Sequence, residues 1–410
     1  MKHDTTGSGD SWTDDRLVKT TLVYAGSLTI MAAAIISPAL PRIRAAYAGT
    51  PDLSLLTGLV LTLPALFIAL GAPVAGVLAD RVGRLRVLTG AALLYALAGS
   101  APLVLDSLAA VLASRAVLGL AVAGVFVAGT TLITDYYTGA TRQRMLGIQG
   151  ALATASGVIF LPLAGVLASV SWRGPFALYL VSLGLIPAVA LVLREPSRQG
   201  TLDEAAKTAP NDGTLRALAG VVGLALVGML AFYTLPVQIP FYVEHVTGGG
   251  TALAGGVLAA AMLAGGVVAA GYRSVRAALG VDGTLVATFL TMAAGFALLG
   301  AAGSLPGLVI GVVVIGGAQG VLVPNLNAVA AAMVPDASRG QALSLVVTGL
   351  FLGQFLSALA SGAAVAAADI RTMYFGAGLL LTLVAVVCGR TSLTEAATEK
   401  RPPTSSVDDD

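Results

Sequence analysis

The sequence is poor in charge and contains a single cysteine. Charged residues make up 11% of the 410 positions, hydrophobic residues make up 57%, and the mean hydropathy is +0.89. Because so few polar side chains cannot cover a water-exposed surface, the composition predicts an integral membrane protein. The net charge of +2 is too small to indicate binding to nucleic acid.

Cysteine and histidine are too scarce for the chemistry that they usually support. Cys388 is alone, which excludes a disulfide within the chain and a thiolate metal site. The two histidines, His3 and His245, lie far apart in the sequence, and no cluster of carboxylates accompanies them. We therefore expect no metal and no cofactor. We also expect that the protein is not an enzyme: a membrane-embedded transferase, which needs paired carboxylates with a divalent metal, is the remotest function considered.

Long apolar runs fill the chain between short polar breaks. A transmembrane helix needs about 20 apolar residues. With proline, glycine and charged residues taken as breaks, the sequence predicts twelve spans, at 20–41, 57–79, 87–105, 108–134, 146–170, 175–193, 216–241, 252–271, 284–303, 307–333, 342–367 and 373–389. The predicted fold class is thus an all-α integral membrane protein.

The longest polar interruption divides these spans into six and six. The predicted organisation is an N-tail at 1–19, a six-helix bundle at 20–193, a linker at 194–215, a second six-helix bundle at 216–389 and a C-tail at 390–410. The segments after spans 4 and 10 resemble each other: Arg142 matches Arg339, and Gly157 falls close to the position of Gly353. This similarity indicates either an internal repeat, as in secondary transporters, or chance likeness between helices rich in alanine and glycine.

The distribution of basic residues predicts the orientation. Eighteen of the 23 Lys and Arg residues fall on the side of the two tails, and four fall on the other side. Because basic residues resist translocation, both termini are expected in the cytoplasm, with the protein in the cell membrane. The polar and acidic N-terminus has no positive region before a short apolar core, so no cleaved signal peptide is expected.

One acid and three arginines gather in the break between spans 2 and 3, in the stretch GVLADRVGRLRVLTG. Asp80 adds nothing to orientation, so its presence suggests pairing with a guanidinium and with the N-terminus of a neighbouring helix. Gly83 suits a turn that needs a positive φ. We expect this cluster to act as a latch that closes the cytoplasmic side and opens during transport.

The same stretch resembles the loop 2–3 signature of the major facilitator superfamily. The matched positions are Gly76, Leu78, Ala79, Asp80, Arg81, Gly83, Arg84 and Arg86. SRAVLGLAVAG is similar to the family's span 4 signature in Arg115 and Gly119, and the segment from 316 to 344 resembles span 10 of the drug:proton antiporter branch. The resemblance implies twelve transmembrane helices in two pseudo-symmetric six-helix bundles, with a substrate site between them.

Span 5 departs from the signature that this branch associates with export. It reads LPLAG, which keeps Pro162 and Gly165, and Gly157 precedes them, so a helix bend is expected there. The second-half counterpart of the latch, GYRSVRAALG, has no acid, so any latch is asymmetric. Span 1 has no acid either.

Few polar residues lie within the spans, and these are the candidates for a substrate or proton pathway. Arg115 either faces the cavity or extends toward the nearer membrane surface. Asp135 and, second to it, Glu244 are the candidates for proton coupling, although a solvated acid at a helix end is the favoured interpretation of each. The uncharged candidates, each of which can instead make a structural hydrogen bond between helices, are Tyr24, Tyr233, Gln238, Gln319, Asn325 and Asn327.

These observations predict a secondary active transporter. The leading hypothesis is a monomeric, proton-coupled exporter of small amphipathic compounds that works by alternating access. Its partners would be the lipid bilayer, a small-molecule substrate and protons. A cavity so poor in charge suits an uncharged or weakly cationic solute. The alternative is an importer or facilitator of a small metabolite with the same fold, which the missing central acid and the imperfect export signature favour.

Overall fold

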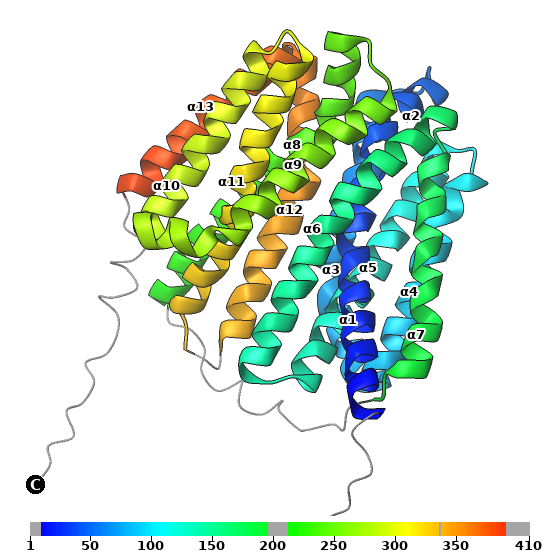
Figure 1. Ribbon diagram of the computed structural model, residues 1–410. Coiled ribbons are helices and arrows are strands. Elements are labelled where there is room, and N and C mark those ends of the chain that lie inside the picture. The colour runs from blue at the N-terminus through cyan, green and yellow to red at the C-terminus, as the bar shows by residue number, and fades with distance from the viewer. Residues whose placement is uncertain (1–9, 196–211, 336–337, 391–410) are drawn as a thin grey trace, which may run out of the picture.

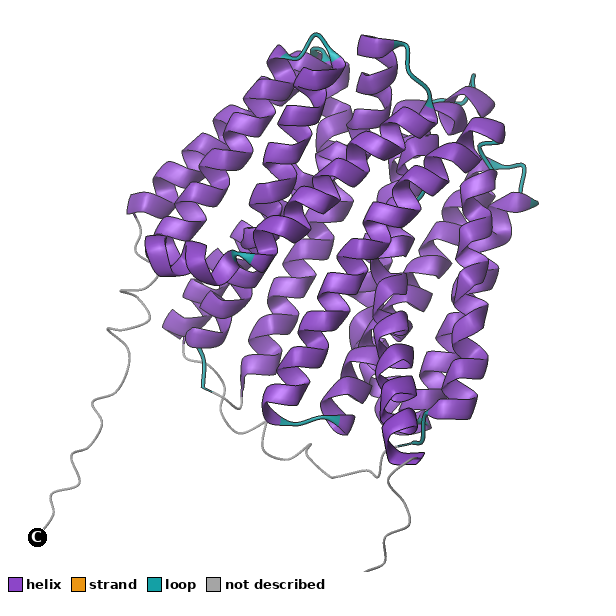
Figure 2. Ribbon diagram, in the orientation of Figure 1, coloured by secondary structure: helices purple, strands orange, loops and turns teal. Residues whose placement is uncertain are grey.

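The computed structural model describes residues 10–195, 212–335 and 338–390, and the described residues form a bundle of helices without strands (Figures 1 and 2). Backbone polar groups within a bilayer must be satisfied inside the segment, which a helix achieves. The N-terminal half contains α1 (Asp10–Ala34), η1 (Ser37–Ala39), α2 (Leu40–Ala46), α3 (Leu53–Val82), α4 (Arg84–Ser100), η2 (Ala101–Leu103), α5 (Leu108–Tyr136), α6 (Gly139–Val170), η3 (Gly174–Gly184) and α7 (Leu185–Val192).

The C-terminal half contains α8 (Asp212–Thr247), α9 (Thr251–Ala270), α10 (Tyr272–Ala301), α11 (Leu305–Ala332), α12 (Arg339–Ala367) and α13 (Ile370–Arg390). Among the described residues, eleven segments are long and apolar enough to cross a membrane, and the segment from Gly174 to Val192 is one of them. The remaining long helix, α1, packs against α5, α6 and α7 inside the N-terminal half. The all-α membrane fold predicted from the sequence is confirmed.

Several predicted boundaries were wrong. The span predicted at 20–41 breaks after Ala34 into η1 and α2, because Pro38 and Pro41 lack the N–H groups that would continue the helix. The break predicted between spans 8 and 9 is mostly helical: α10 already begins at Tyr272 and kinks at Gly280, whose φ of 69° favours glycine.

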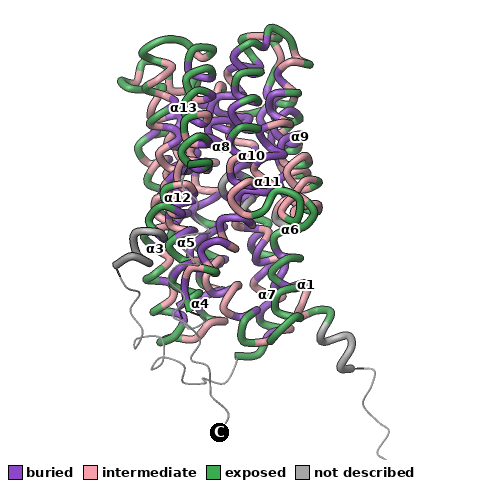
Figure 3. Tube along the Cα trace, turned by 90° about the vertical axis from the view of Figure 1, so that its left-hand side faces the viewer, coloured by how far each residue is buried: buried purple, intermediate pink, exposed green. Residues whose placement is uncertain are grey.

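Two clusters of buried apolar side chains lie at the centre of the two halves, and Figure 3 shows buried residues running along the middle of the bundle. Each cluster also contains a few residues from the other half. Val237 and Ala358 of the C-terminal half pack into the N-terminal cluster, while Ala34 and Leu161 of the N-terminal half pack into the C-terminal cluster. The halves therefore meet through packed side chains.

The bundle has two distinct ends. The tail end, at the bottom of Figure 1, is where α1 begins and where the chain turns from α5 into α6. The far end carries α2, the turn between α8 and α9, and the turn between α12 and α13. These two names are used for the ends below.

Candidate functional site

The two halves are joined toward the far end through close approaches of small residues. In α3, a Cβ on Gly58 would lie 3.0 Å from the Cβ of Ala358 in α12. The hydroxyl of Ser37 donates a hydrogen bond to the backbone carbonyl of Pro236 in α8. Small residues allow helices to approach closely where lipid supplies no hydrophobic drive. We call this contact zone, with the α6–α9 contact described next, the far-end seam.

The segment of α6 singled out for its proline and glycine lies in the same seam. The hydroxyl of Thr251 in α9 donates a 2.7 Å hydrogen bond to the carbonyl oxygen of Gly165, and a Cβ on Gly255 would lie 2.5 Å from the carbonyl oxygen of Leu161. Pro162 lies inside α6 at this contact. Gly157 lies farther along α6 toward the tail end, beside the side chain of Met262.

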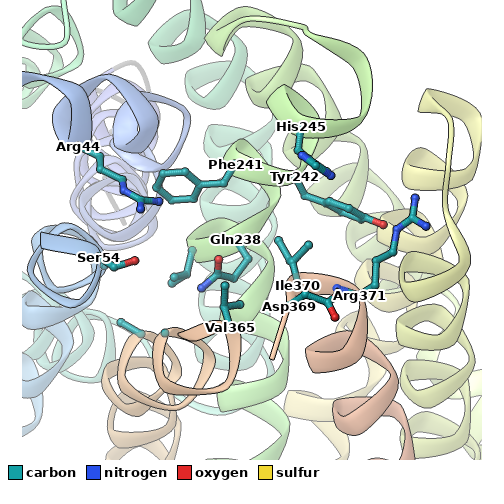
Figure 4. A pocket seen from close by; sticks show the side chains of 14 residues that line it. Arg44, Ser54, Gln238, Phe241, Tyr242, His245, Val365, Asp369, Ile370 and Arg371 are labelled. Atoms are coloured by element: carbon teal, nitrogen blue, oxygen red, sulfur yellow. The ribbon is translucent and has the colours of Figure 1, made fainter. Parts of the chain in front are cut away.

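A cavity of about 670 Å³ opens at the far end, directly above the seam (Figure 4). Its floor is made of buried residues from both halves, among them Gly58, Val237, Gln238 and Ala358. Its rim is exposed and polar, and it carries Arg44, Ser54, His245, Asp369 and Arg371. We call this cavity the far-end vestibule.

Asp369 is fixed at the rim as the cap of α13. Its carboxylate accepts hydrogen bonds from the Thr372 hydroxyl at 2.6 Å, and from the backbone N–H groups of Arg371 at 2.7 Å and Thr372 at 3.1 Å. The hydroxyl and backbone N–H of Thr372 are the main reasons why the pKa of Asp369 lies below its usual value. The acid therefore stays ionised at neutral pH.

At the tail end the contact between the halves is looser. Among residues 140–152 of α6 only Met145 and Gln149 are buried, and Gln149 packs against Gly26 of α1. Most of the circumference of this part of α6 is therefore exposed at the protein surface. Higher up, Phe126 of α5 and Phe351 of α12 make an edge contact between the halves, with ring centroids 6.4 Å apart.

The loop between α3 and α4 holds an ion pair and a helix cap. The guanidinium of Arg84 lies 2.5 Å from the carboxylate of Asp135, and these side chains are 19% and 22% exposed. The backbone N–H groups of Arg84 and Leu85 donate to the carboxylate of Glu195, at 2.6 and 3.0 Å. Gly83, with φ of 111°, permits this turn. A carboxylate at a helix N-terminus satisfies unpaired N–H groups and the helix dipole.

Asp80 does not occupy the paired position that the sequence suggested for it. It is exposed and makes no hydrogen bond or ion pair within the described part of the chain, and the roles expected of it are filled by Asp135 and Glu195. Arg86 donates weakly to the carbonyl of Val82, at 3.5 Å. The cluster lies within the N-terminal half, so the latch between the halves stays a prediction, as do the latch roles of Arg81 and Gly76.

Arg115 lies inside the N-terminal half and does not line the vestibule. Its side chain is 0% exposed, and one Nη donates to the carbonyl oxygens of Ala98 and Gly99, both at 2.8 Å. Its guanidinium carbon lies 5.0 Å from the ring centroids of both Phe176 and Tyr179. Such cation–π contacts and charged hydrogen bonds stabilise a buried guanidinium. Its Nε and its other Nη are buried without a hydrogen-bond partner among the described residues, and the pathway role of Arg115 stays a prediction.

Of the uncharged candidates, only Gln238 lines the vestibule, where its amide donates to Ser361 at 3.0 Å. The others lie within one half. Tyr24 donates to the carbonyl of Val181, Tyr233 packs against Phe232, and Gln319 contacts Met229. Asn325 is fully buried, where it donates to Val281 and accepts from Tyr272, and the buried side-chain oxygen of Asn327 has no hydrogen-bond partner.

Sequence reasoning missed the residues that lie just outside the spans. Glu195 was treated as part of a linker, Arg44 and Arg371 entered only the count of basic residues that predicts orientation, and Asp369 was not singled out. The position of Asp369, one residue before a helical run and three before Thr372, is a helix-start pattern that could have revealed it. Within the described residues no three His, Cys, Asp or Glu side chains gather where they could hold a metal ion.

Comparison with known proteins identifies the family. A model described as Major Facilitator Superfamily matches residues 22–281 and 277–408, which together cover most of the chain. The chain belongs to the Major Facilitator Superfamily. Members of the Major Facilitator Superfamily are transporters, so this chain is a multi-pass membrane protein that acts on a small-molecule substrate. A search of curated protein sequences found no significant match.

Solved structures share the fold at low identity. A bacterial homologue of the human lysosomal transporter Spinster, in an inward-facing and unoccupied conformation, matches with a TM-score of 0.76 and 16% identity over 97% of this chain and 100% of that chain. The xylose transporter XylE from E. coli, in an inward-open conformation, matches with a TM-score of 0.74 and 16% identity over 93% of this chain and 99% of that chain. The nucleoside transporter NupG, as a point mutant, matches with a TM-score of 0.73 and 12% identity over 90% of this chain and 99% of that chain. At such identities the likeness shows the fold alone.

Proposed function

We propose that this transporter exports small amphipathic compounds, uncharged or weakly cationic, in exchange for protons. It works as a monomer in the cell membrane by alternating access, with its tail end in the cytoplasm. The resemblance of the segment from 316 to 344 to span 10 of the drug:proton antiporter branch supports the substrate class. The excess of basic residues toward the tails supports the orientation.

The observation that carries the proposal is the unequal contact between the halves at the two ends. The far-end seam joins α3 to α12 and α6 to α9, whereas the stretch 140–152 of α6 is exposed around most of its circumference at the tail end. Alternating access requires one end to close while the other opens. The segment with Pro162 and Gly165 lies in the seam, where it would have to separate for release at the far end.

Asp135 is the residue that we propose for proton coupling. Its ion pair with Arg84 ties the end of α5 to the start of α4, beside the short loop that follows α3. Protonation of the Asp135 carboxylate would remove the charge that holds Arg84, and so would change the contacts of this loop. A proton entering at this position is thereby linked to a segment that is expected to move.

The test is proton flux in liposomes that contain the purified protein. A pH gradient is imposed, a panel of lipophilic cations and neutral amphiphiles is added, and collapse of the gradient is followed by a fluorescent pH indicator. We expect protein-dependent collapse with a few compounds and its loss in Asp135→Asn. The matched control is Asp106→Asn, which removes an acid that pairs with Arg173 within the N-terminal half. Collapse that persists in Asp135→Asn would exclude Asp135 as the coupling residue.

A facilitator or importer of a small metabolite is the second candidate. It is favoured by the position of Asp135, which lies at the tail end of α5 rather than in the far-end seam, and by the lack of any acid among the vestibule's floor residues. Xylose and nucleoside transporters share the fold. Saturable solute flux without proton movement in the same liposomes would support this function over export.

A further inference from the structure

The far-end vestibule has the size and composition of a small-molecule site. Its volume of about 670 Å³ lies in the range of typical ligand pockets, about 300–1,000 Å³. Apolar side chains line its wall, including Phe241, Val365 and Ile370, while the charged groups are confined to the rim. This arrangement fits a molecule with an apolar body and a polar head.

The charges at the rim favour an anionic head. Arg44 and Arg371 contribute two positive charges, and Asp369 is the one carboxylate among the lining residues. Three hydrogen-bond donors of its own helix end already engage Asp369. It is therefore poorly placed to neutralise a guanidinium across the cavity. His245 also lies at the rim.

Arg44 is available to a ligand. Its guanidinium carbon lies 5.7 Å from the ring centroid of Phe241, and it makes no hydrogen bond or ion pair with any described residue. In Figure 4 the Arg44 side chain extends toward Phe241. The Arg371 guanidinium lies beyond Tyr242, turned away from Arg44, and donates a 3.4 Å hydrogen bond to the carbonyl oxygen of Ala302. An arginine whose donors have no protein acceptor can form charge-assisted hydrogen bonds with a carboxylate.

We propose that the far-end vestibule binds a small amphipathic monocarboxylate. The carboxylate binds the guanidinium of Arg44, and the apolar part rests on Phe241, Val365 and Ile370. This site lies where the substrate pathway would open at the far end, and its ligand differs in charge from the exported compounds proposed above.

Occupancy has a conformational consequence that rests on the proposed alternating access. Arg44 belongs to the N-terminal half, whereas Phe241, Arg371 and the apolar wall belong to the C-terminal half. A ligand that contacts both halves binds only while the far end is closed. It therefore stabilises that conformation and inhibits transport from the far side.

The binding test uses radiolabelled phenylbutyrate and the full-length protein in lipid nanodiscs, measured by equilibrium dialysis against empty nanodiscs. We expect saturable binding to the protein. Arg44→Gln should weaken it by roughly tenfold, because it loses a charge-assisted hydrogen bond. Arg371→Gln should weaken it less, because the Arg371 guanidinium is turned toward Ala302 and adds only a positive charge at the rim. Unlabelled phenylbutanol and phenylbutylamine should compete poorly with the labelled acid.

The matched control is Arg42→Gln, which removes an exposed arginine of the same short helix that does not line the cavity. It should leave binding unchanged. Melting temperature and gel-filtration volume verify that each variant is folded. The site is refuted by no saturable binding, by binding in Arg44→Gln equal to that of the wild type, or by equal competition from the alcohol.

A second measurement tests the conformational consequence without relying on transport. Spin labels are attached through Ala46→Cys and Ala366→Cys, two exposed far-end positions on opposite halves, with the buried native cysteine replaced by Cys388→Ser. Phenylbutyrate at saturation should narrow the distribution of distances between the two spin labels and shift it toward shorter distances. An unchanged distribution with binding intact would refute the closing effect and leave the site in place. Failure of the liposome proton assay affects neither result.

Discussion

Thr251, at the first turn of α9, donates a 2.7 Å hydrogen bond to the backbone carbonyl oxygen of Gly165 in α6. A side chain of one half is thereby bound to the main chain of the other. The bond is possible because α6 and α9 approach through glycine, without side chains that would hold them apart. Closure at the far end therefore depends on small residues as much as on polar groups.

Gly255→Ala should weaken the far-end seam. A Cβ at this position would lie 2.5 Å from the carbonyl oxygen of Leu161, and such overpacking costs about 1–3 kcal/mol. Hydrogen–deuterium exchange should rise severalfold in the segments 160–170 and 248–256. Gly256→Ala is the control, because no atom lies within 4 Å of its Cβ. Equal exchange in both variants would contradict the tight contact.

Arg115→Leu should destabilise the N-terminal half. The variant loses charged hydrogen bonds to Ala98 and Gly99 and the contacts with two aromatic rings, worth about 2–4 kcal/mol together. Arg115→Lys should recover part of this loss. The melting temperature of the purified protein reports the effect. If melting is unchanged while substrate binding disappears, Arg115 belongs to the substrate pathway.

Glu195→Ala should loosen the start of α4. The carboxylate accepts hydrogen bonds from the backbone N–H groups of Arg84 and Leu85, and loss of a helix cap costs about 0.5–2 kcal/mol. Faster amide exchange at residues 84–88 measures the change. Glu244→Ala, at another exposed acid, should leave this segment as protected as in the wild type.

Asp80→Asn should reduce the rate of transport and leave membrane insertion intact. The side chain is exposed in this conformation, in which the far end is closed, so a latch role would operate when the tail end closes. Transport rate per inserted molecule is measured in liposomes. Full activity of Asp80→Asn would remove the latch from the mechanism.

Asp369 should make stability at the far end depend on pH. Hydrogen bonds from Thr372 and Arg371 favour the charged form, so its pKa in the folded protein lies below the ordinary value of about 4. The folded state therefore binds this proton less tightly than the unfolded state. The stabilisation is present above about pH 4 and is lost as the pH falls through the lowered pKa. The melting-temperature difference between wild type and Asp369→Asn should be constant above about pH 5 and shrink toward about pH 3. A difference that does not vary with pH would contradict the capping role.

The extent of the membrane-spanning helices was largely predictable, because hydropathy and backbone satisfaction act over one segment at a time. The helix boundaries that were predicted wrongly also have local causes. Pro38 and Pro41 divide the first span, and the kink at Gly280 follows a helical stretch that was predicted as a loop. The turn at Gly83 was also expected from the residues around it, since only glycine adopts its φ easily.

The partners of the charged groups were decided by the tertiary structure. Asp135 and Glu195 are distant from Arg84 in the sequence, and helix packing brings them to it in preference to the adjacent Asp80. In the same way, packing turns Arg115 toward the aromatic rings of η3, and it places Arg44 and Arg371 around one cavity. The sequence by itself determined which segments enter the bilayer and that they form a transporter of this superfamily, because those properties reside in local composition and motifs. Only the packing of the helices decided which side chains meet, because the direction of a side chain depends on how its helix is rotated against its neighbours.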